Sequence, residues 1–188
     1  EVGMFLLRVR MNVTGREKIP RDTRFLLVSN HRTIFDPVLT MAELSEFTLA
    51  FISKKENFKI PIVNKLMHMC FCLPLDREDN RAAVKTINEA VELLDENVVS
   101  MGIYPEGQTN KTEEPLLPFR NGAFKIAQKA KVPIVVCTLQ GTDQVKVNIK
   151  HLRSTPIELH LLDVITPEQM EGRTATDIGE QIYQMMST

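Results

Sequence analysis

A histidine and an aspartate with four residues between them are the pair in this sequence best suited to proton transfer. They are His31 and Asp36, in the segment Asn30-His31-Arg32-Thr33-Ile34-Phe35-Asp36-Pro37. A neutral imidazole accepts a proton near pH 7, and a nearby carboxylate fixes its tautomer and stabilises the imidazolium. The spacing exceeds one helical turn, so a loop bending into a helix start would have to bring the side chains together. A surface histidine followed by an ordinary helix-capping aspartate gives the same pattern.

Two other segments place polar groups at the ends of apolar runs. Ile103-Tyr104-Pro105-Glu106-Gly107-Gln108-Thr109-Asn110 puts a carboxylate at a tight turn, where exposed backbone N–H groups can hold a polar head group. A plain turn with a solvated glutamate is the alternative. Arg77 ends the run Leu73-Pro74-Leu75-Asp76-Arg77, and a guanidinium there is suited to bidentate phosphate binding. A surface salt bridge to a neighbouring carboxylate is equally compatible with that pattern.

The elements that must position these residues alternate between strands and helices. Apolar runs predict strands over 25–29, 48–53, 72–75, 98–104, 132–137 and 157–164. Helical periodicity predicts helices over 60–69, 80–96, 121–131 and 174–186. Asp36-Pro37 reads as one more helix start, with the aspartate as the cap and the proline at the first helical position. This alternation indicates an α/β sheet covered by helices on both faces.

The composition is that of a single globular domain. The chain has 188 residues, 43% of them apolar and 25% charged, with a formal net charge of −1. No global field therefore draws it to nucleic acid, and we expect no nucleic-acid partner. Three cysteines argue against a disulfide framework, and we expect Cys70 and Cys72 to be packed in apolar surroundings. We expect no metal site, because His68, His151 and His160 lack ligand partners at metal spacing; the same lack argues against a metallophosphoesterase, which also uses Asn-His.

One stretch could meet a membrane surface. Four lysines interleave with apolar side chains in a basic amphipathic pattern suited to anionic lipid: Lys54, Lys55, Lys59 and Lys65 among Phe58, Ile60, Ile62, Val63, Leu66 and Met67. An internal helix with solvated lysines would give the same pattern. No window approaches the ~18 apolar residues of a membrane span. Met4-Phe5-Leu6-Leu7 could be the tail of a removed hydrophobic segment, so the domain could lack an N-terminal membrane-associated part.

Taken together and in order, these segments resemble a known family. Asn30-His31 with Asp36 forms a first block, Ser53-Lys54-Lys55-Glu56 leading to Asp76-Arg77 a second, Tyr104-Pro105-Glu106-Gly107 a third and Val132-Pro133-Ile134-Val135-Val136 a fourth. The lysophosphatidic acid acyltransferases, or 1-acylglycerol-3-phosphate O-acyltransferases, carry Asn-His-x4-Asp, a lysine and an arginine, Phe-Pro-Glu-Gly-Thr-Arg and Val-Pro-Ile-Val-Pro. The resemblance extends over about residues 14–136.

The resemblance implies both a fold and a reaction. The fold would be a mixed, largely parallel sheet of the glycerolphosphate-acyltransferase type, with residues 1–188 forming a single acyltransferase domain. A fatty acyl group would pass from acyl-coenzyme A or acyl carrier protein to the free hydroxyl of lysophosphatidic acid, giving phosphatidic acid in phospholipid biosynthesis. His31 and Asp36 would be the catalytic residues, and no cofactor beyond the donor substrate would be needed. The protein would work at the cytoplasmic face of a membrane, peripherally or through a segment absent from this chain.

Acceptor binding is where the sequence departs from the family pattern. By resemblance it would involve a set of polar and glycine residues near the strand ends: Asn30, Lys54, Arg77, Glu106, Gly107, Gln108 and Thr109. Gln108-Thr109 stand where the family has Thr-Arg, so an arginine expected near the phosphate is missing, and Lys111 or Arg120 could take its place. Another lysophospholipid or other acceptor, or a non-catalytic lipid-binding protein of the same fold, therefore stays open.

Overall fold

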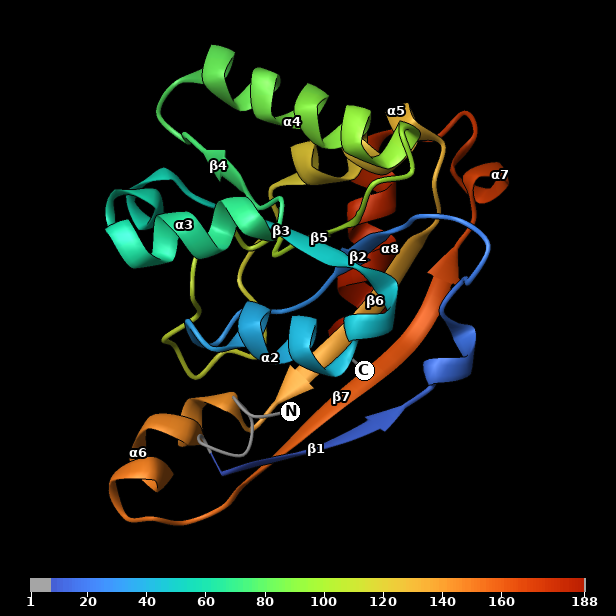
Figure 1. The fold of residues 1–188 in the computed structure, drawn as a ribbon. Coiled ribbons are helices and arrows are strands. Elements are labelled where there is room, and N and C mark those ends of the chain that lie inside the picture. The colour runs from blue at the N-terminus through green and yellow to red at the C-terminus, as the bar shows by residue number, and fades with distance from the viewer. Residues whose placement is uncertain (1–7, 188) are drawn as a thin grey trace.

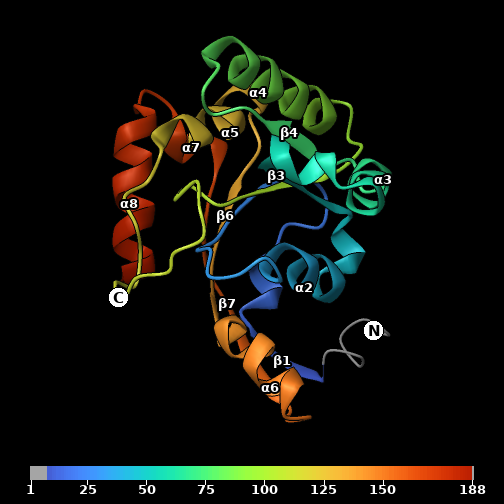
Figure 2. The same ribbon diagram turned by 90° about the vertical axis from the view of Figure 1, so that its left-hand side faces the viewer.

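A seven-stranded sheet forms the centre of the computed structural model, which describes residues 8–187 apart from the side chain of Ile62 (Figures 1 and 2). The segment Met4–Leu7 lies outside the described residues. The strand order is β1-β7-β6-β2-β5-β3-β4. The strands are β1 (Val9–Thr14), β2 (Leu26–Val28), β3 (Leu49–Lys54), β4 (Leu73–Leu75), β5 (Ser100–Ile103), β6 (Ile134–Gln140) and β7 (Thr155–Ile165).

Five neighbouring strands run in the same direction. β4, β3, β5, β2 and β6 pair in parallel, β7 is antiparallel to β6, and β1 is parallel to β7. The mixed, largely parallel sheet predicted from the resemblance is confirmed. Leu26, Leu27 and Val28 of the central strand are fully buried, because helices cover both faces of the sheet and leave no solvent side. The carboxyl ends of β2, β3, β4 and β5 consequently lie along one edge.

Helices cover both faces, as Figure 2 shows from the side. One face carries α4 (Asn80–Asp95), α5 (Lys125–Ala130), α7 (Pro167–Met170) and α8 (Ala175–Ser187), whose apolar residues form one core with Leu26 and Val28. The other carries α2 (Asp36–Glu43), α3 (Pro61–Met69) and α6 (Val145–Lys150), which pack in a second core with Leu27. Short 3-10 turns complete the chain: η1 (Arg16–Lys18), η2 (Ser45–Phe47), η3 (Lys55–Lys59), η4 (Asn121–Phe124) and η5 (Thr142–Gln144). Within residues 8–187, every helix is too short or too polar to cross a bilayer.

The strand β1 and the short helices α6 and α7 were not predicted, and the structure differs from the sequence-based expectations at three further points. Asp36 does not cap α2: it is the first helical residue, preceded by Phe35, and its carboxylate accepts hydrogen bonds from the loop before the helix. Cys70 is exposed, contrary to expectation, because it ends α3 just before a turn in which Phe71 has a φ of 58°. Cys72, which follows this turn, is buried as predicted. The helix expected over 121–131 begins as the 3-10 turn η4 and only then becomes α5.

Candidate active site

His31 and Asp36 form a direct hydrogen bond at the carboxyl end of β2. The distance from His31 Nδ1 to Asp36 Oδ2 is 2.8 Å. A carboxylate only accepts, so Nδ1 carries the proton and Nε2 is left as the basic nitrogen. The His31 side chain is 18% exposed and that of Asp36 1%, so the imidazole can be reached from outside while its carboxylate partner is buried. The loop therefore brings the two predicted residues together in the arrangement that a general base requires.

The loop before α2 holds the Asp36 carboxylate in place and ionised. Oδ2 also accepts the backbone N–H groups of Arg32 at 2.6 Å and Thr33 at 2.8 Å, and Oδ1 accepts the Thr33 hydroxyl at 2.8 Å. Burial by itself raises the pKa of Asp36, but the hydrogen bonds from His31 and Thr33 outweigh it and hold the pKa below its ordinary value. A charged, rigidly held carboxylate thus faces His31.

An aromatic stack fixes the imidazole plane. The Tyr104 ring lies parallel to the His31 ring, with centroids 4.1 Å apart and an interplanar angle of 10°. Phe51 stacks on Tyr104 in turn, at 5.2 Å. Tyr104 directly follows β5 and Phe51 lies within β3, so two neighbouring strands support the ring. Burial raises the pKa of Tyr104 well above its ordinary value, which keeps the phenol neutral. The one feature of the sequence that points to this contact is the aromatic residue just before Pro-Glu-Gly.

Glu106 orders the backbone around the histidine. The residue is buried, and its two carboxylate oxygens accept the backbone N–H groups of His31 at 2.7 Å and Leu117 at 2.9 Å. Asn110 donates its own N–H to the His31 carbonyl at 2.7 Å. Burial raises the pKa of Glu106, partly opposed by these backbone hydrogen bonds. The contacts of Glu106 therefore support a role in ordering this loop.

The Asn30 side chain faces β6. Its Nδ2 donates to the Leu139 carbonyl at 3.0 Å, and its Oδ1 accepts the Leu139 N–H at 2.7 Å. The residue is 7% exposed. These contacts tie the start of the loop that carries His31 to the neighbouring strand. They also occupy both ends of an amide that the resemblance assigns to acceptor binding.

The basic residues predicted to bind the acceptor lie at neighbouring strand ends. Lys54 ends β3 and is exposed, with its Nζ 3.5 Å from Glu56 Oε2. Arg77 follows β4, whose Leu75 is paired with Lys54, and is half-buried. Gly107 turns the chain after β5 with a φ of 73°, a conformation that favours glycine. Gln108 is exposed and Thr109 half-buried. The contacts of Gln108 and Thr109 with an acceptor stay predictions.

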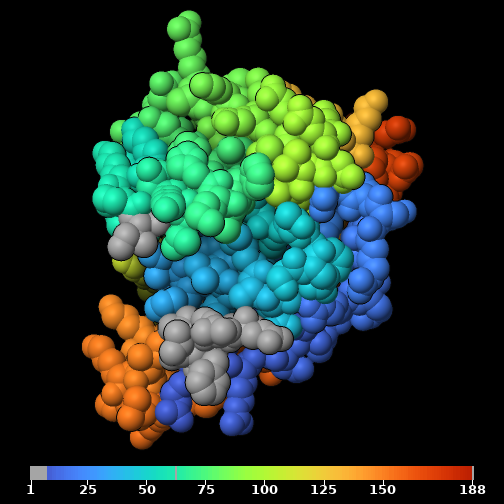
Figure 3. All heavy atoms as spheres, in the orientation of Figure 1, coloured from blue at the N-terminus to red at the C-terminus, as the bar shows by residue number. Residues whose placement is uncertain are grey.

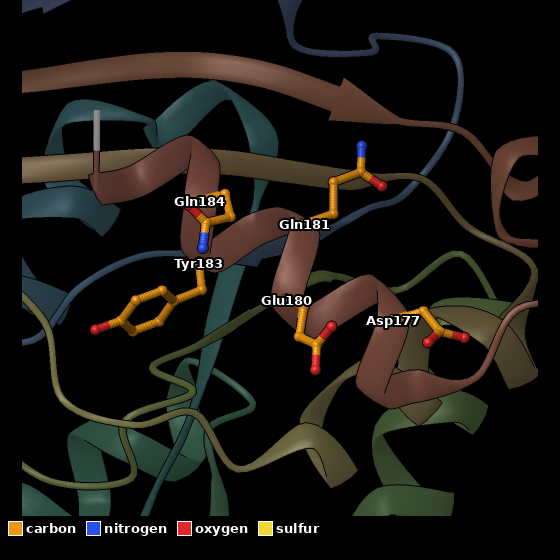
Figure 4. A pocket seen from close by; sticks show the side chains of 5 residues that line it. All are labelled: Asp177, Glu180, Gln181, Tyr183 and Gln184. Carbon is orange, nitrogen blue, oxygen red and sulfur yellow. The ribbon is translucent and has the colours of Figure 1, made fainter.

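A separate hollow lies on the face of the sheet that carries α4 and α8, whereas α2 and Asp36 lie on the other face. It has a volume of about 380 Å³ and is lined by side chains of α8: Asp177, Glu180, Gln181, Tyr183 and Gln184 (Figure 4). Asp177 accepts the Thr174 hydroxyl at 2.8 Å and so belongs to the start of the helix. These five side chains include no histidine paired with a carboxylate like His31 with Asp36. Across residues 8–187, no three histidine, cysteine or acidic side chains gather as a metal site would require.

Comparison with known proteins places the site in a family. The family model described as acyltransferase matches residues 10–140, and the chain belongs to this family. The chloroplastic 1-acyl-sn-glycerol-3-phosphate acyltransferase of Brassica napus is 36% identical over 137 residues, which are 72% of this chain and 39% of that protein. The 1-acyl-sn-glycerol-3-phosphate acyltransferase of Borreliella burgdorferi is 25% identical over 193 residues, covering 100% of this chain and 76% of that one.

A solved structure has the same fold. The crystal structure of the 1-acyl-sn-glycerophosphate acyltransferase PlsC from Thermotoga maritima superposes with a TM-score of 0.77 and 27% identity, covering 96% of this chain and 70% of that chain. The family predicted from the four sequence blocks is confirmed. The chain spans about two fifths of the Brassica napus protein.

Proposed function

We propose that this protein transfers a fatty acyl group from a thioester of coenzyme A or acyl carrier protein to the free hydroxyl of lysophosphatidic acid. The observation that carries the proposal is the His31–Asp36 hydrogen bond, in a chain of the acyltransferase family, at the strand edge that also carries Arg77. Related proteins named as 1-acyl-sn-glycerol-3-phosphate acyltransferases support this choice of acceptor. The product would be phosphatidic acid, as in phospholipid biosynthesis.

His31 serves as general base in one displacement on the thioester. Its Nε2 takes the proton from the acceptor hydroxyl as the oxygen attacks the thioester carbonyl, while Asp36 stabilises the imidazolium. The carbon–sulfur bond then breaks, and the thiolate leaves with the proton returned by the imidazolium. The new ester and a free thiol are the products. A general base of this kind contributes about 10²–10⁴-fold to the rate.

Acceptor recognition begins with the charge at Arg77. The guanidinium follows β4 on the same sheet edge as His31, and a planar fork of donors suits a phosphate. Lys54, at the end of the adjacent strand, adds a second positive charge at this edge. If Arg77 binds the acceptor phosphate, Arg77→Ala raises the KM for lysophosphatidic acid; an unchanged KM contradicts this role.

A bilayer would supply the acceptor to the face that α3 and α2 form. α3 and the turn after it expose Leu66, Met69 and Phe71 beside Lys65, and α2 exposes Val38. Figure 3 shows the face of the molecule on which α3 and α2 lie. Apolar side chains beside lysines fit the surface of an anionic membrane. We expect vesicles containing anionic lipid to bind the protein at low salt, and Leu66→Ser with Met69→Ser to weaken this binding. If the protein binds neither anionic nor neutral vesicles, the membrane proposal is contradicted.

The reaction itself is tested by thiol release. Acyl-coenzyme A and acyl carrier protein are each supplied with a panel of lysophospholipids and simple alcohols, with His31→Ala run in parallel. We expect wild type to release thiol with lysophosphatidic acid and the variant to be inactive but folded. Release only with another acceptor would change the substrate and keep the chemistry. No thiol with any acceptor and either donor would instead favour a lipid-binding protein without catalysis.

A further inference from the structure

The side chain of Arg120 lies against the Glu106-Gly107 turn, and its positive charge acts on Arg77 from a distant part of the chain. Arg120 directly precedes η4, and its backbone N–H donates to the Pro105 carbonyl at 2.8 Å. This bond holds Arg120 against the turn. Its side chain crosses Gly107 so closely that a Cβ added there would lie 2.7 Å from Arg120 Nε and 2.8 Å from Arg120 Cδ. Glycine at 107 therefore provides the room through which this arginine passes.

Arg77 follows β4 at the same edge of the sheet and has a donor without a partner. The Nε atom of Arg77 is buried, and within residues 8–187 it makes no hydrogen bond. Burial lowers the pKa of Arg77, and the positive charge of Arg120 lowers it further, with only Glu56 acting in the opposite direction. Among the described residues, no carboxylate lies within 4.0 Å of either guanidinium.

Such a pair is unfavourable without an anion. Two neighbouring guanidinium groups repel, and a buried N–H without an acceptor carries a desolvation cost. A phosphate with two negative charges removes both penalties, because its oxygens accept from both planar forks. The position of Arg120 also suits the acceptor, because it lies close to His31 along the chain of contacts. Arg120 lies against Gly107, and the residue before this glycine, Glu106, accepts the backbone N–H of His31.

We propose that Arg120 and Arg77 together bind the acceptor phosphate, with Arg120 taking the place of the arginine missing from the Glu106-Gly107-Gln108-Thr109 segment. This inference rests on the proposed acyl transfer to lysophosphatidic acid. It assigns the role of the family's missing arginine to Arg120 and not to Lys111, the other basic residue considered for it. Both residues are exposed, but the side chain of Arg120 lies against Gly107, and its positive charge lowers the pKa of Arg77.

The test compares acceptors with and without phosphate. In thiol-release assays, Arg120→Gln should raise the KM for lysophosphatidic acid about 10- to 100-fold, the usual weight of a charged hydrogen bond, with kcat nearly unchanged. Arg120→Lys should recover part of the loss. Turnover of a monoacylglycerol with the same acyl chain should not change. Arg153→Gln removes an equal charge from an exposed position after α6 and should behave as wild type.

A binding measurement separates this inference from the proposed function. His31→Ala is titrated with glycerol 3-phosphate by calorimetry, with and without Arg120→Gln. Loss of binding with Arg120→Gln supports the arginine pair even if the wild type releases no thiol, in which case the proposed function alone fails. An unchanged KM and unchanged binding overturn the inference while the acyl transfer stands. The inference is also overturned if Lys111→Gln, and not Arg120→Gln, weakens phosphate binding. It is overturned as well if Arg120→Gln lowers turnover of lysophosphatidic acid and of the monoacylglycerol equally.

Discussion

Replacing Asp36 with asparagine would remove one charge and leave the loop between His31 and Asp36 intact. In the protein, Oδ2 accepts three N–H groups and Oδ1 accepts the Thr33 hydroxyl. The asparagine carbonyl can take the place of Oδ2, and its amide can face the Thr33 hydroxyl, which can rotate to accept. The His31 tautomer is then kept, because Nδ1 still donates to an oxygen.

The size of the effect follows from the lost interaction between imidazolium and carboxylate. With Nδ1 and Oδ2 2.8 Å apart, the two charge centres are separated by about 4 Å. At an effective dielectric constant of about 20, this interaction amounts to about 4 kcal/mol in the transition state. Asp36→Asn should therefore lower kcat by about 10³-fold, within the range known for general-base catalysis.

The assay is thiol release at saturating donor and acceptor, beside thermal unfolding of the same variants. Thr33→Val is the matched control: it removes the hydroxyl bonded to Oδ1, keeps the charge and should cost less than about 10-fold. Because His31 and Asp36 act as a unit, adding Asp36→Asn to His31→Ala should slow the reaction no further. A fall of less than about 5-fold in the folded Asp36→Asn variant, or independent effects in the double variant, refutes the reasoning.

Three further predictions concern stability. The folded-state pKa of Asp36 lies below its ordinary value, so the ionised carboxylate stabilises the fold. This stabilisation is complete above the unfolded-state pKa of about 3.9 and is lost as the pH falls through the folded-state pKa. In urea unfolding, the difference in free energy of unfolding between wild type and Asp36→Asn should therefore close below about pH 4. Glu106→Gln directs an amide N–H at a buried backbone N–H and should cost about 1–3 kcal/mol by the same method, with lower activity; unchanged stability contradicts it. Asn30→Ala leaves the buried N–H and carbonyl of Leu139 without partners and should cost about 2–4 kcal/mol, whereas a cost under about 0.5 kcal/mol means that water replaces the amide.

The sequence predicted six of the seven strands and singled out His31 and Asp36, because both inferences depend on local patterns. Apolar runs such as that of β2 are long enough to mark buried strands, and a residue after such a strand must lie at the sheet edge. The exposure of Cys70 was missed because it depends on the left-handed turn at Phe71, which no local preference indicates. Asp36 was misread as a cap because helix-start signals do not reveal which way a carboxylate turns.

Contacts between distant segments were beyond sequence reasoning. The stack of Tyr104 on His31 joins the ends of two strands that are neighbours only through the sheet order. The approach of Arg120 to Gly107 and Arg77 depends on how the polar loop folds back, which a residue count cannot give. The contacts on which the proposed acceptor site rests therefore became visible only in three dimensions.

The most direct test of the account is the rate at which His31→Ala forms phosphatidic acid and free coenzyme A from lysophosphatidic acid and acyl-coenzyme A. Calorimetric binding of lysophosphatidic acid to the same variant serves as the control for folding and acceptor binding. We predict a rate at least about 10²-fold below wild type, with binding retained, because only the base is removed. A near-normal rate in a variant that still binds the acceptor would contradict the assignment of His31 as the general base.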